Sequence, residues 1–190
     1  MEKREEADNN REERNNEGKE EREDGRVPQM ALNHISRLCR NVKESIDFYS
    51  KVLGLVLIER PPTFEFDGAW LFNYGVGVHL IQAKNEDSLP QTDRRLDPMD
   101  NHVSFQCEDM KALEQRLKQF NVEYTTRTMD DDKNGTRIDQ LFSRDADGYV
   151  IEICNCENLK LVPAGSLGTI KLPSDRHNPP VDLENGHHAK

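Results

Sequence analysis

One four-residue motif occurs twice in this chain, and the repeat constrains the fold more than any other feature. The two copies are Asn33–Ser36 (Asn-His-Ile-Ser) and Asn101–Ser104 (Asn-His-Val-Ser), 68 positions apart (101 minus 33). A cysteine follows each copy at the same offset, as Cys39 and Cys107. A repeat of this kind predicts two copies of one supersecondary module, each beginning with the same strand.

Each motif begins an alternation of strand and helix patterns, in the same order in both halves. Apolar residues recur at helical spacing in 42–53 and 110–120, and Gly54 predicts the end of the first helix. The other apolar runs are short and bounded by turn residues, which predicts strands. These strands are 31–38, 55–58, 69–74 and 76–81, then 102–107, 122–126, 137–143 and 149–153. Both halves therefore predict a β-α-β-β-β module, and the fold class is α+β.

The two modules fill the middle of the chain, at 31–83 and 101–153 of a domain spanning 30–155. A chain of 190 residues with 34% hydrophobic content allows one domain of ordinary size with a real core. Residues 1–27 are nearly all charged or amide residues, so burial cannot offset the entropy of ordering them. We predict a disordered charged tail there, and a mostly disordered tail at 157–190.

The charge and the cysteines limit the partners and the compartment. A formal charge of −10 argues against a nucleic-acid or anionic-membrane surface, and no apolar run is long enough for a signal or a bilayer span. The sequence thus predicts a cytoplasmic protein with four free thiols. Cys154 and Cys156 point to the same strand face, but we interpret the loop between them as too short for a useful disulfide.

Four polar residues interrupt the apolar strands at matching places in the two modules. His34 and His102 begin the first strands, while His79 and Glu152 lie in the last strands. The separations are 45 positions (79 minus 34) and 50 positions (152 minus 102), so His79 and Glu152 are equivalent. A carboxylate inside an apolar strand is costly unless it is paired or bound to a metal ion.

These four side chains together predict a metal site. A strand histidine or glutamate alone is more typical of a hydrogen-bonded or solvated residue, but four in symmetric positions favour a shared role. Three imidazoles and one carboxylate suit a divalent ion such as zinc, iron, manganese, nickel or cobalt. We therefore predict the metal ligands to be His34, His79, His102 and Glu152.

Several segments resemble a known family. They are 45–55 (Ser-Ile-Asp-Phe-Tyr-Ser-Lys-Val-Leu-Gly-Leu) after the first Asn-His pair, 101–105 (Asn-His-Val-Ser-Phe) and 145–153 (Asp-Ala-Asp-Gly-Tyr-Val-Ile-Glu-Ile). Over 30–155 the chain resembles the vicinal oxygen chelate superfamily, and within it the glyoxalase I-like branch. Small plant glyoxalase I-like proteins are most similar, including 68–72 (Gly-Ala-Trp-Leu-Phe) and 153–156 (Ile-Cys-Asn-Cys).

The resemblance implies two βαβββ modules that form an incurved mixed sheet around a divalent metal ion. It also implies a site that two chains of a homodimer can share. By position, His34, His102 and Glu152 match the family's metal ligands. His79 falls where glyoxalase I has a second glutamate, so a set of three histidines and one glutamate departs from the family's two and two.

The resemblance further implies the activity of a lactoylglutathione lyase-like enzyme in methylglyoxal detoxification. The substrate is the hemithioacetal of a 2-oxoaldehyde and a thiol such as glutathione. Glu152 is the catalytic base, and the metal polarises the substrate oxygens. The predicted substrate-binding residues are Arg37, Trp70 and Phe72. The arginine with which glyoxalase I binds glutathione is replaced by Leu38, and Arg37, one strand position away, points to the other face.

Two other functions stay open from the residues. An iron(II) dioxygenase would use His34, His102 and Glu152 as a two-histidine, one-carboxylate triad, with His79 beside it. A non-catalytic or regulatory binding protein would keep the modules and lose the chemistry, which the altered fourth ligand and the missing arginine favour. Metal content and turnover with methylglyoxal and glutathione separate the three.

Overall fold

The computed structural model describes residues 30–91, 95–131, 135–165 and 170. The chain divides into two units after Ala31, and the second unit holds both modules. The tail predicted at the start of the chain lies outside the described residues, as does most of the tail predicted at its end. Within the described part, no helix is both long and apolar enough to cross a membrane.

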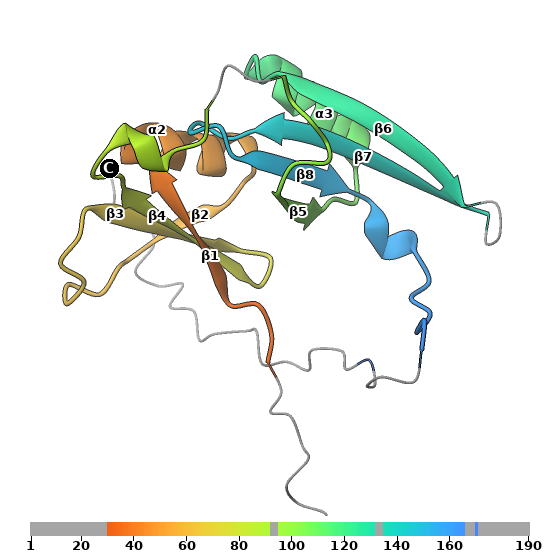
Figure 1. Cartoon of the computed structure of the whole chain (residues 1–190), viewed down its shortest axis with the longest axis horizontal. Helices are drawn as coiled ribbons and strands as arrows, with labels where there is room; N and C mark the ends of the chain where they lie inside the picture. Colours follow the sequence, from red (N-terminus) through yellow and green to blue (C-terminus); the bar gives the residue numbers. More distant parts are fainter. Residues whose placement is uncertain (1–29, 92–94, 132–134, 166–169, 171–190) are drawn as a thin grey trace, which may run out of the picture. The chain divides into compact units, whose positions relative to one another are not determined.

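The first module is a mixed four-stranded sheet with one helical crossover (Figure 1). It consists of β1 (His34–Cys39), α2 (Val42–Asp47), the π-helical turn η1 (Phe48–Val52), β2 (Val56–Ile58), β3 (Gly68–Asn73) and β4 (Val76–Gln82). The strand order is β1-β4-β3-β2, with β1 parallel to β4 and the other neighbours antiparallel. The helical segment joins β1 to β2, which lie at opposite edges of the sheet, and the chain then returns through β3 to β4, the parallel neighbour of β1.

The second module repeats this arrangement. It consists of β5 (His102–Gln106), α3 (Met110–Gln119), β6 (Tyr124–Asp131), β7 (Thr136–Arg144) and β8 (Val150–Cys154), followed by the 3-10 turn η3 (Cys156–Asn158). The order is β5-β8-β7-β6, again with a parallel first pair. Another 3-10 turn, η2 (Glu86–Ser88), lies between the modules. The predicted α+β fold of two βαβββ modules is confirmed, as two four-stranded mixed sheets.

The helix predicted over 42–53 is present, but its hydrogen bonding changes midway. Asn41 caps α2, because its side-chain oxygen accepts from two backbone N–H groups of the first turn. From Phe48 the helix widens, and the N–H of Leu53 donates to the Phe48 carbonyl, 3.4 Å away. Gly54, with φ +78°, ends the segment as predicted.

The strand predicted over 122–126 begins later than expected, at Tyr124. Val122 closes the end of α3 instead, because its N–H donates to the Leu117 carbonyl (2.9 Å) and Asn121 has φ +53°. The Val122 side chain packs against the core. A local pattern cannot distinguish such a residue from the first residue of a strand.

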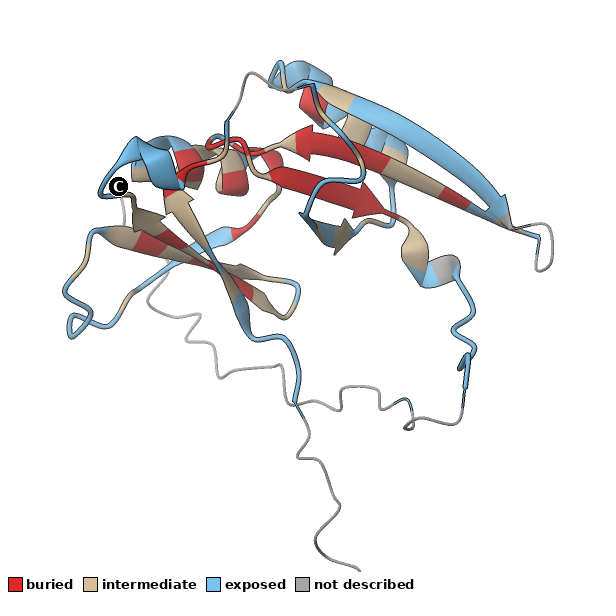
Figure 2. Cartoon of the chain, viewed as in Figure 1, coloured by how far each residue is buried: buried red, intermediate tan, exposed pale blue. Residues whose placement is uncertain are grey.

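The core lies against one face of each sheet, and both modules contribute to it (Figure 2). Because neighbouring strand residues point to opposite faces, the histidine and glutamate positions lie on the faces turned away from this core. The buried cluster comprises Cys39, Tyr49, Val52, Leu55, Ala69, Leu71, Val78, Leu80, Leu117, Leu141, Ile151 and Ile153.

Two buried carboxylates join the modules in what we call the aspartate clasp. The turn between β7 and β8 carries Asp145 and Asp147. Asp147 accepts hydrogen bonds from Ser45 Oγ (2.6 Å) and from the N–H of Arg40, and Asp145 accepts one from the Tyr49 hydroxyl (2.8 Å). Burial raises the pKa of both Asp145 and Tyr49. The clasp therefore fixes the second module's turn to the first module's helix.

Candidate metal and active site

Strand register gives the two modules matching pairs of polar residues. Ser36 lies opposite His79 in the first sheet, and Ser104 lies opposite Glu152 in the second. The predicted equivalence of His79 and Glu152 is therefore confirmed. Each of them shares a sheet face with the histidine that begins the parallel neighbouring strand.

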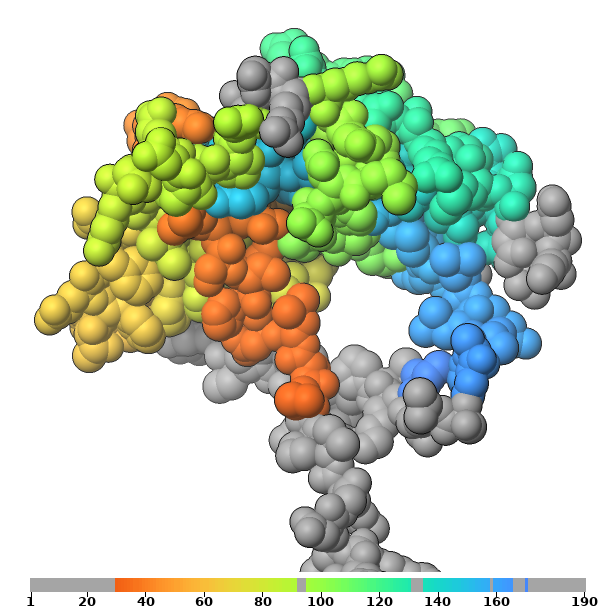
Figure 3. Space-filling model, in the orientation of Figure 1, coloured from red at the N-terminus to blue at the C-terminus, as the bar shows by residue number. Residues whose placement is uncertain are grey.

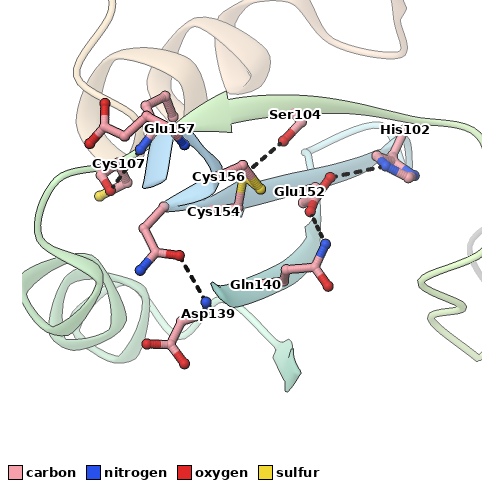
Figure 4. The surroundings of a disulfide bond; sticks show 11 residues. His102, Ser104, Cys107, Asp139, Gln140, Glu152, Cys154, Cys156 and Glu157 are labelled. Atoms are coloured by element: carbon pink, nitrogen blue, oxygen red, sulfur yellow. Dashed lines mark hydrogen bonds and ion pairs between the residues drawn. A yellow bond between two sulfur atoms is a disulfide. The ribbon is translucent and has the colours of Figure 1, made fainter. Parts of the chain in front are cut away.

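In the second module, His102 and Glu152 contact each other (Figure 4). Nε2 of His102 lies 3.1 Å from Oε2 of Glu152, and Glu152 is only 6% exposed. Nδ1 of His102 lies 2.7 Å from the Asp100 carbonyl oxygen, which can only accept, so Nδ1 carries a proton. Gln140 donates a hydrogen bond from Nε2 to the other carboxylate oxygen. A buried carboxylate is thereby held against an imidazole nitrogen.

This contact needs positive charge on the ring or between the two atoms. With Nδ1–H directed at Asp100, a neutral His102 presents an Nε2 lone pair to the lone pairs of the carboxylate, which repel it. In octahedral coordination, two ligands of a divalent ion that are each about 2.1 Å from it and at right angles lie about 3.0 Å apart. The observed separation of 3.1 Å is close to that value, and it equally suits a hydrogen bond from a protonated ring nitrogen. His102 and Glu152 thus fit the role of adjacent ligands of one metal ion.

In the first module, His34 and His79 stack on each other. Their ring centroids are 3.9 Å apart at an interplanar angle of 15°, and Trp70 stacks on His79 at 4.2 Å and 4°. Burial lowers the pKa of His79, and the neighbouring His34 lowers it further. These effects favour the neutral imidazole, the form that binds metal ions.

Gly77 leaves room for this stack. It lies opposite His34, and a Cβ at this position would be 3.0 Å from the His34 Cβ and 3.6 Å from His79 Nε2. Val150 occupies the equivalent position opposite His102 in the second module. The start of β1 lies at the surface (Figure 3), and His34 is exposed there. The His34 ring is therefore open to solvent, whereas His79 is half-buried between His34 and Trp70.

The four predicted ligands form two pairs, one on each sheet. In the part of the chain that the structure describes, one group of three side chains brings possible ligand atoms within 4.8 Å of one another. That group is Glu152, Cys154 and Cys156, and neither His34 nor His79 belongs to it. Within one chain, the structure joins His34 to His79 and His102 to Glu152, without bringing the pairs together.

Two of the predicted substrate-binding residues share the histidine face of the first sheet. On β3, Trp70 lies opposite His79 and Phe72 opposite Gly77. Phe64 packs on Trp70 edge to face, with centroids 5.0 Å apart. Trp70 and Phe72 therefore lie where a substrate near His79 could contact them.

Arg37 lies on the other face of β1. It is opposite Leu80, a fully buried core residue, and its guanidinium carbon lies 4.7 Å from the centre of the Tyr149 ring. Its Nε is buried without a hydrogen-bond partner. The structure thus directs Arg37 toward the second module and away from the histidines.

The prediction of free thiols is wrong for one pair of cysteines. Cys154 and Cys156 form a disulfide, with Cα atoms 5.3 Å apart (Figure 4), whereas Cys39 and Cys107 are free. Asn155 leaves the strand conformation, with φ −100° and ψ 37°, and a 3-10 turn follows. This bend brings the two sulfurs together, and only the spacing of two residues signalled it.

Sequence reasoning also missed Gln140 as a partner of Glu152. The strand that contains Gln140 is recognisable from the sequence. The register of β7 against β8, however, determines which β7 residue lies diagonally opposite Glu152. Gln140 pairs with Cys154 in that register, which brings its amide to the carboxylate. No local motif around Gln140 marks this contact.

A cavity of about 1010 Å³ lies in another part of the fold. Its walls include Phe48, Arg95, Tyr124, Arg144 and Asp145. None of the predicted ligands or substrate-binding residues lines it. The open faces of the two sheets, and not this cavity, carry the candidate site.

Comparison with known protein families fits this geometry. The model of the Glyoxalase/Bleomycin resistance protein/Dioxygenase superfamily matches residues 31–153, which cover both modules. The chain belongs to this superfamily. Members of the superfamily typically hold a divalent metal ion.

Among relatives in the superfamily, the chain is 47% identical over 147 residues to Glyoxylase I 4 of Arabidopsis thaliana, covering 75% of this chain and 83% of the relative. It is 25% identical over 130 residues to the uncharacterized protein YqjC of Bacillus subtilis, covering 65% and 90%. The first of these relationships supports a glyoxalase I-like protein.

Solved structures of the superfamily share the fold. A glyoxalase family protein from Bacillus anthracis has a TM-score of 0.54 and 17% identity, covering 68% of this chain and 97% of that one. The fosfomycin resistance protein FosX from Listeria monocytogenes has a TM-score of 0.51 and 16% identity, covering 67% and 93%. At these identities the likeness concerns the fold alone.

Proposed function

We propose that this protein is a glyoxalase I-like, metal-dependent lyase. Its substrate is the hemithioacetal of a 2-oxoaldehyde and a thiol such as glutathione. The contact between His102 and the buried carboxylate of Glu152 carries the proposal, because it places a base and a metal ligand together. The similarity to the Arabidopsis protein named Glyoxylase I 4 supports it.

We also propose a cytoplasmic location, without nucleic-acid or membrane partners, on the charge and composition alone.

The residues of this chain have distinct roles in the proposed reaction. Glu152 takes the proton from the carbon next to the substrate carbonyl, and Gln140 holds one of its oxygens in place. Asp100 fixes the His102 ring so that Nε2 faces the site. Trp70 covers the face of His79 and supplies an apolar wall. A divalent ion held by the predicted ligands would supply polarisation of the substrate oxygens.

We further propose that two chains complete the site as a homodimer. The first module of one chain would supply His34 and His79, and the second module of its partner chain would supply the other pair. The separation of the two pairs within one chain supports this arrangement. A symmetric dimer then contains two equivalent sites.

The first experiment measures metal content and turnover together. Purified protein is analysed for bound metal and assayed with methylglyoxal and glutathione, before and after treatment with a chelator. We expect a bound divalent ion and turnover that disappears on chelation and returns with added metal. Metal-free protein without turnover, even after metal is added, would exclude the lyase.

A mixing experiment tests the shared site. One variant carries His34→Ala with His79→Ala, and the other carries His102→Ala with Glu152→Ala. Each alone is expected to be inactive. In a mixed dimer, one of the two shared sites is intact, so random exchange of subunits should restore about a quarter of wild-type activity. Sites contained within single chains would stay inactive after mixing.

A non-catalytic binding protein is the second candidate. The fourth position carries the neutral ring of His79 in place of a carboxylate, and Arg37 faces Tyr149, so neither the second charge nor the glutathione arginine of glyoxalase I is present. A His79→Glu variant that gains turnover over an inactive wild type would support this candidate. The iron(II) dioxygenase stays a prediction, tested by oxygen uptake with a catechol after iron loading.

A further inference from the structure

Three possible metal donors converge at the end of β8, and the proposed lyase uses only one of them. Donor atoms of Glu152, Cys154 and Cys156 all lie within 4.8 Å of one another. Glu152 and Cys154 are buried, at 6% and 3% exposure, while Cys156 is half-buried. Figure 4 shows the two sulfurs beside the carboxylate, on the same side of the strand.

Hydrogen bonds outside the disulfide hold this segment in position. The side-chain oxygen of Asn155 accepts from the N–H of Asp139 (2.8 Å), and its N–H donates to the Asp139 carbonyl (3.3 Å). The N–H of Glu157 donates to Gln106 (2.9 Å). The Cys154 carbonyl accepts from the N–H of Cys107, the residue after β5 (2.8 Å). The two sulfurs are therefore held near each other whether or not they are bonded.

We propose that Glu152, Cys154 and Cys156 bind a thiophilic divalent ion such as zinc when the disulfide is reduced. Two thiolates on a tetrahedral zinc lie about 3.8 Å apart, so the observed grouping needs only small side-chain rotations. Three protein ligands leave one position open, as in catalytic zinc sites. The site requires neither His34 nor His79, and it does not depend on the proposed lyase activity.

The disulfide makes this site dependent on redox state. A dithiol reductant breaks the sulfur–sulfur bond, becomes a disulfide itself and leaves two thiols on the protein. The ion then binds both sulfurs and displaces their two protons. In the disulfide form the sulfurs carry no negative charge, so the site is closed to zinc.

Glu152 belongs to both sites, which links them. An ion held by the two cysteines draws the carboxylate away from His102, which is 3.1 Å from it in the disulfide form. This consequence rests on the proposed function. It predicts that the oxidised protein has the higher lyase activity when zinc is supplied in excess.

The experiment titrates cobalt(II), a spectroscopic substitute for zinc, into anaerobic protein in the reduced and oxidised forms. The expected number of reactive thiols after denaturation is four when reduced and two when oxidised, because Cys39 and Cys107 are free. We expect a thiolate-to-cobalt charge-transfer band, saturating at one ion per chain, in the reduced form only. An equal band in both forms, or no band in the reduced form, would overturn the proposal.

Variants locate the site. Cys156→Ser should weaken cobalt binding at least about 100-fold, since even losing an outer-shell contact costs 10–100-fold, and its band at saturation should have the reduced intensity of one thiolate. Glu152→Gln should weaken binding about tenfold or more and keep the full sulfur band. Cys107→Ser is the matched cysteine control and should keep wild-type binding. If Cys156→Ser keeps the wild-type affinity and band intensity, or the band disappears in Cys107→Ser, the assignment is wrong.

Two further measurements separate the test of the thiolate site from misfolding of a variant and from failure of the proposed lyase activity. Circular dichroism checks that each variant folds, and Cys156 is half-buried, so its replacement perturbs packing less than replacement of the buried Cys154. A double variant, His34→Ala with His79→Ala, should keep the cobalt band. A band without any turnover would support the thiolate site and count only against the proposed lyase.

Discussion

The two modules place different chemistry at the same strand positions. In the first, His79 is stacked between two rings, His34 and Trp70. In the second, Glu152 receives a hydrogen bond from Gln140 and contacts His102. The strand register around His79 and around Glu152 is the same, because each lies opposite a serine of the parallel neighbouring strand. The comparison teaches that duplication preserved the backbone positions of the site, while the surroundings of each position determine what its side chain can do.

The neighbours of each pair explain the contrast. Gly77 opposite His34 makes space for rings to stack face to face. Val150 opposite His102 fills that space, and His102 instead meets the carboxylate through an edge nitrogen. The first module therefore offers an aromatic surface with two stacked imidazoles, and the second offers an imidazole in contact with a hydrogen-bonded carboxylate.

The largest expected effect is a difference in enzymatic turnover between variants at the two equivalent positions, Glu152 and His79. Replacing Glu152 with Gln removes the proposed base, so kcat with methylglyoxal and glutathione should fall about 10²–10⁴-fold. His79→Gln at the equivalent position should act mainly through metal affinity, and added metal should restore most of its turnover. Equal, metal-insensitive losses in both variants would show that the two modules do not have different roles.

The aspartate clasp gives the next effect, on stability. Ser45→Ala removes a 2.6 Å hydrogen bond to the buried Asp147 carboxylate, so the free energy of unfolding should fall by about 1.5–3 kcal/mol. The matched control is Thr128→Ala, which removes an exposed hydrogen bond to Asp139 and should cost at most about 1 kcal/mol. Urea unfolding measures both, and similar losses would contradict a buried junction.

Much of the fold was predictable because its signals are local or repeated. The Asn-His-x-Ser motif located both first strands, and counting positions made His79 and Glu152 equivalent, which the register confirms. The segment 145–153 was recognisable as a turn and a strand. Its contacts with Ser45 and Tyr49 were not, because they join residues about a hundred positions apart and no local pattern encodes them.

The candidate site was less predictable for the same reason. Register is set within each sheet, so the pairs His34–His79 and His102–Glu152 follow from sequence. Whether the pairs meet depends on how the sheets pack through the shared core. The disulfide after β8 likewise depends on Asn155 bonding to Asp139 on a neighbouring strand.

Gly77→Ala should produce a smaller change, confined to the first module. The added Cβ would lie 3.0 Å from the His34 Cβ, so we expect a net loss of about 1 kcal/mol in unfolding free energy. Gly165→Ala is the control, because nothing lies within 4 Å of its added Cβ. If both variants have equal stability, the contact with His34 has no energetic weight.

The smallest expected effect is a pH dependence at the clasp. Burial holds the pKa of Asp145 above its ordinary value of 3.8, so the folded state binds this proton more tightly than the unfolded state does. The stability that Asp145 contributes is therefore full below about pH 3.8 and decreases as the pH rises through the raised pKa.

Comparing wild type with Asp145→Asn isolates this contribution. The difference in unfolding free energy, wild type minus variant, should decrease as the pH rises from about 4 to 7. Urea titrations at several pH values measure it. A difference that increases with pH would mean that the hydrogen bond from Tyr49 outweighs the cost of burial.

The clasp and the shared core bind the modules without using the segment that connects them. The contacts run from Asp145 and Asp147 to α2 and its flanking residues, and Arg116 of α3 adds a bond to the Val52 carbonyl at 2.9 Å. Covalent continuity between the halves is therefore not what makes them recognise each other. Expressed as two separate polypeptides, 30–83 and 101–156, they should reassociate into the native fold.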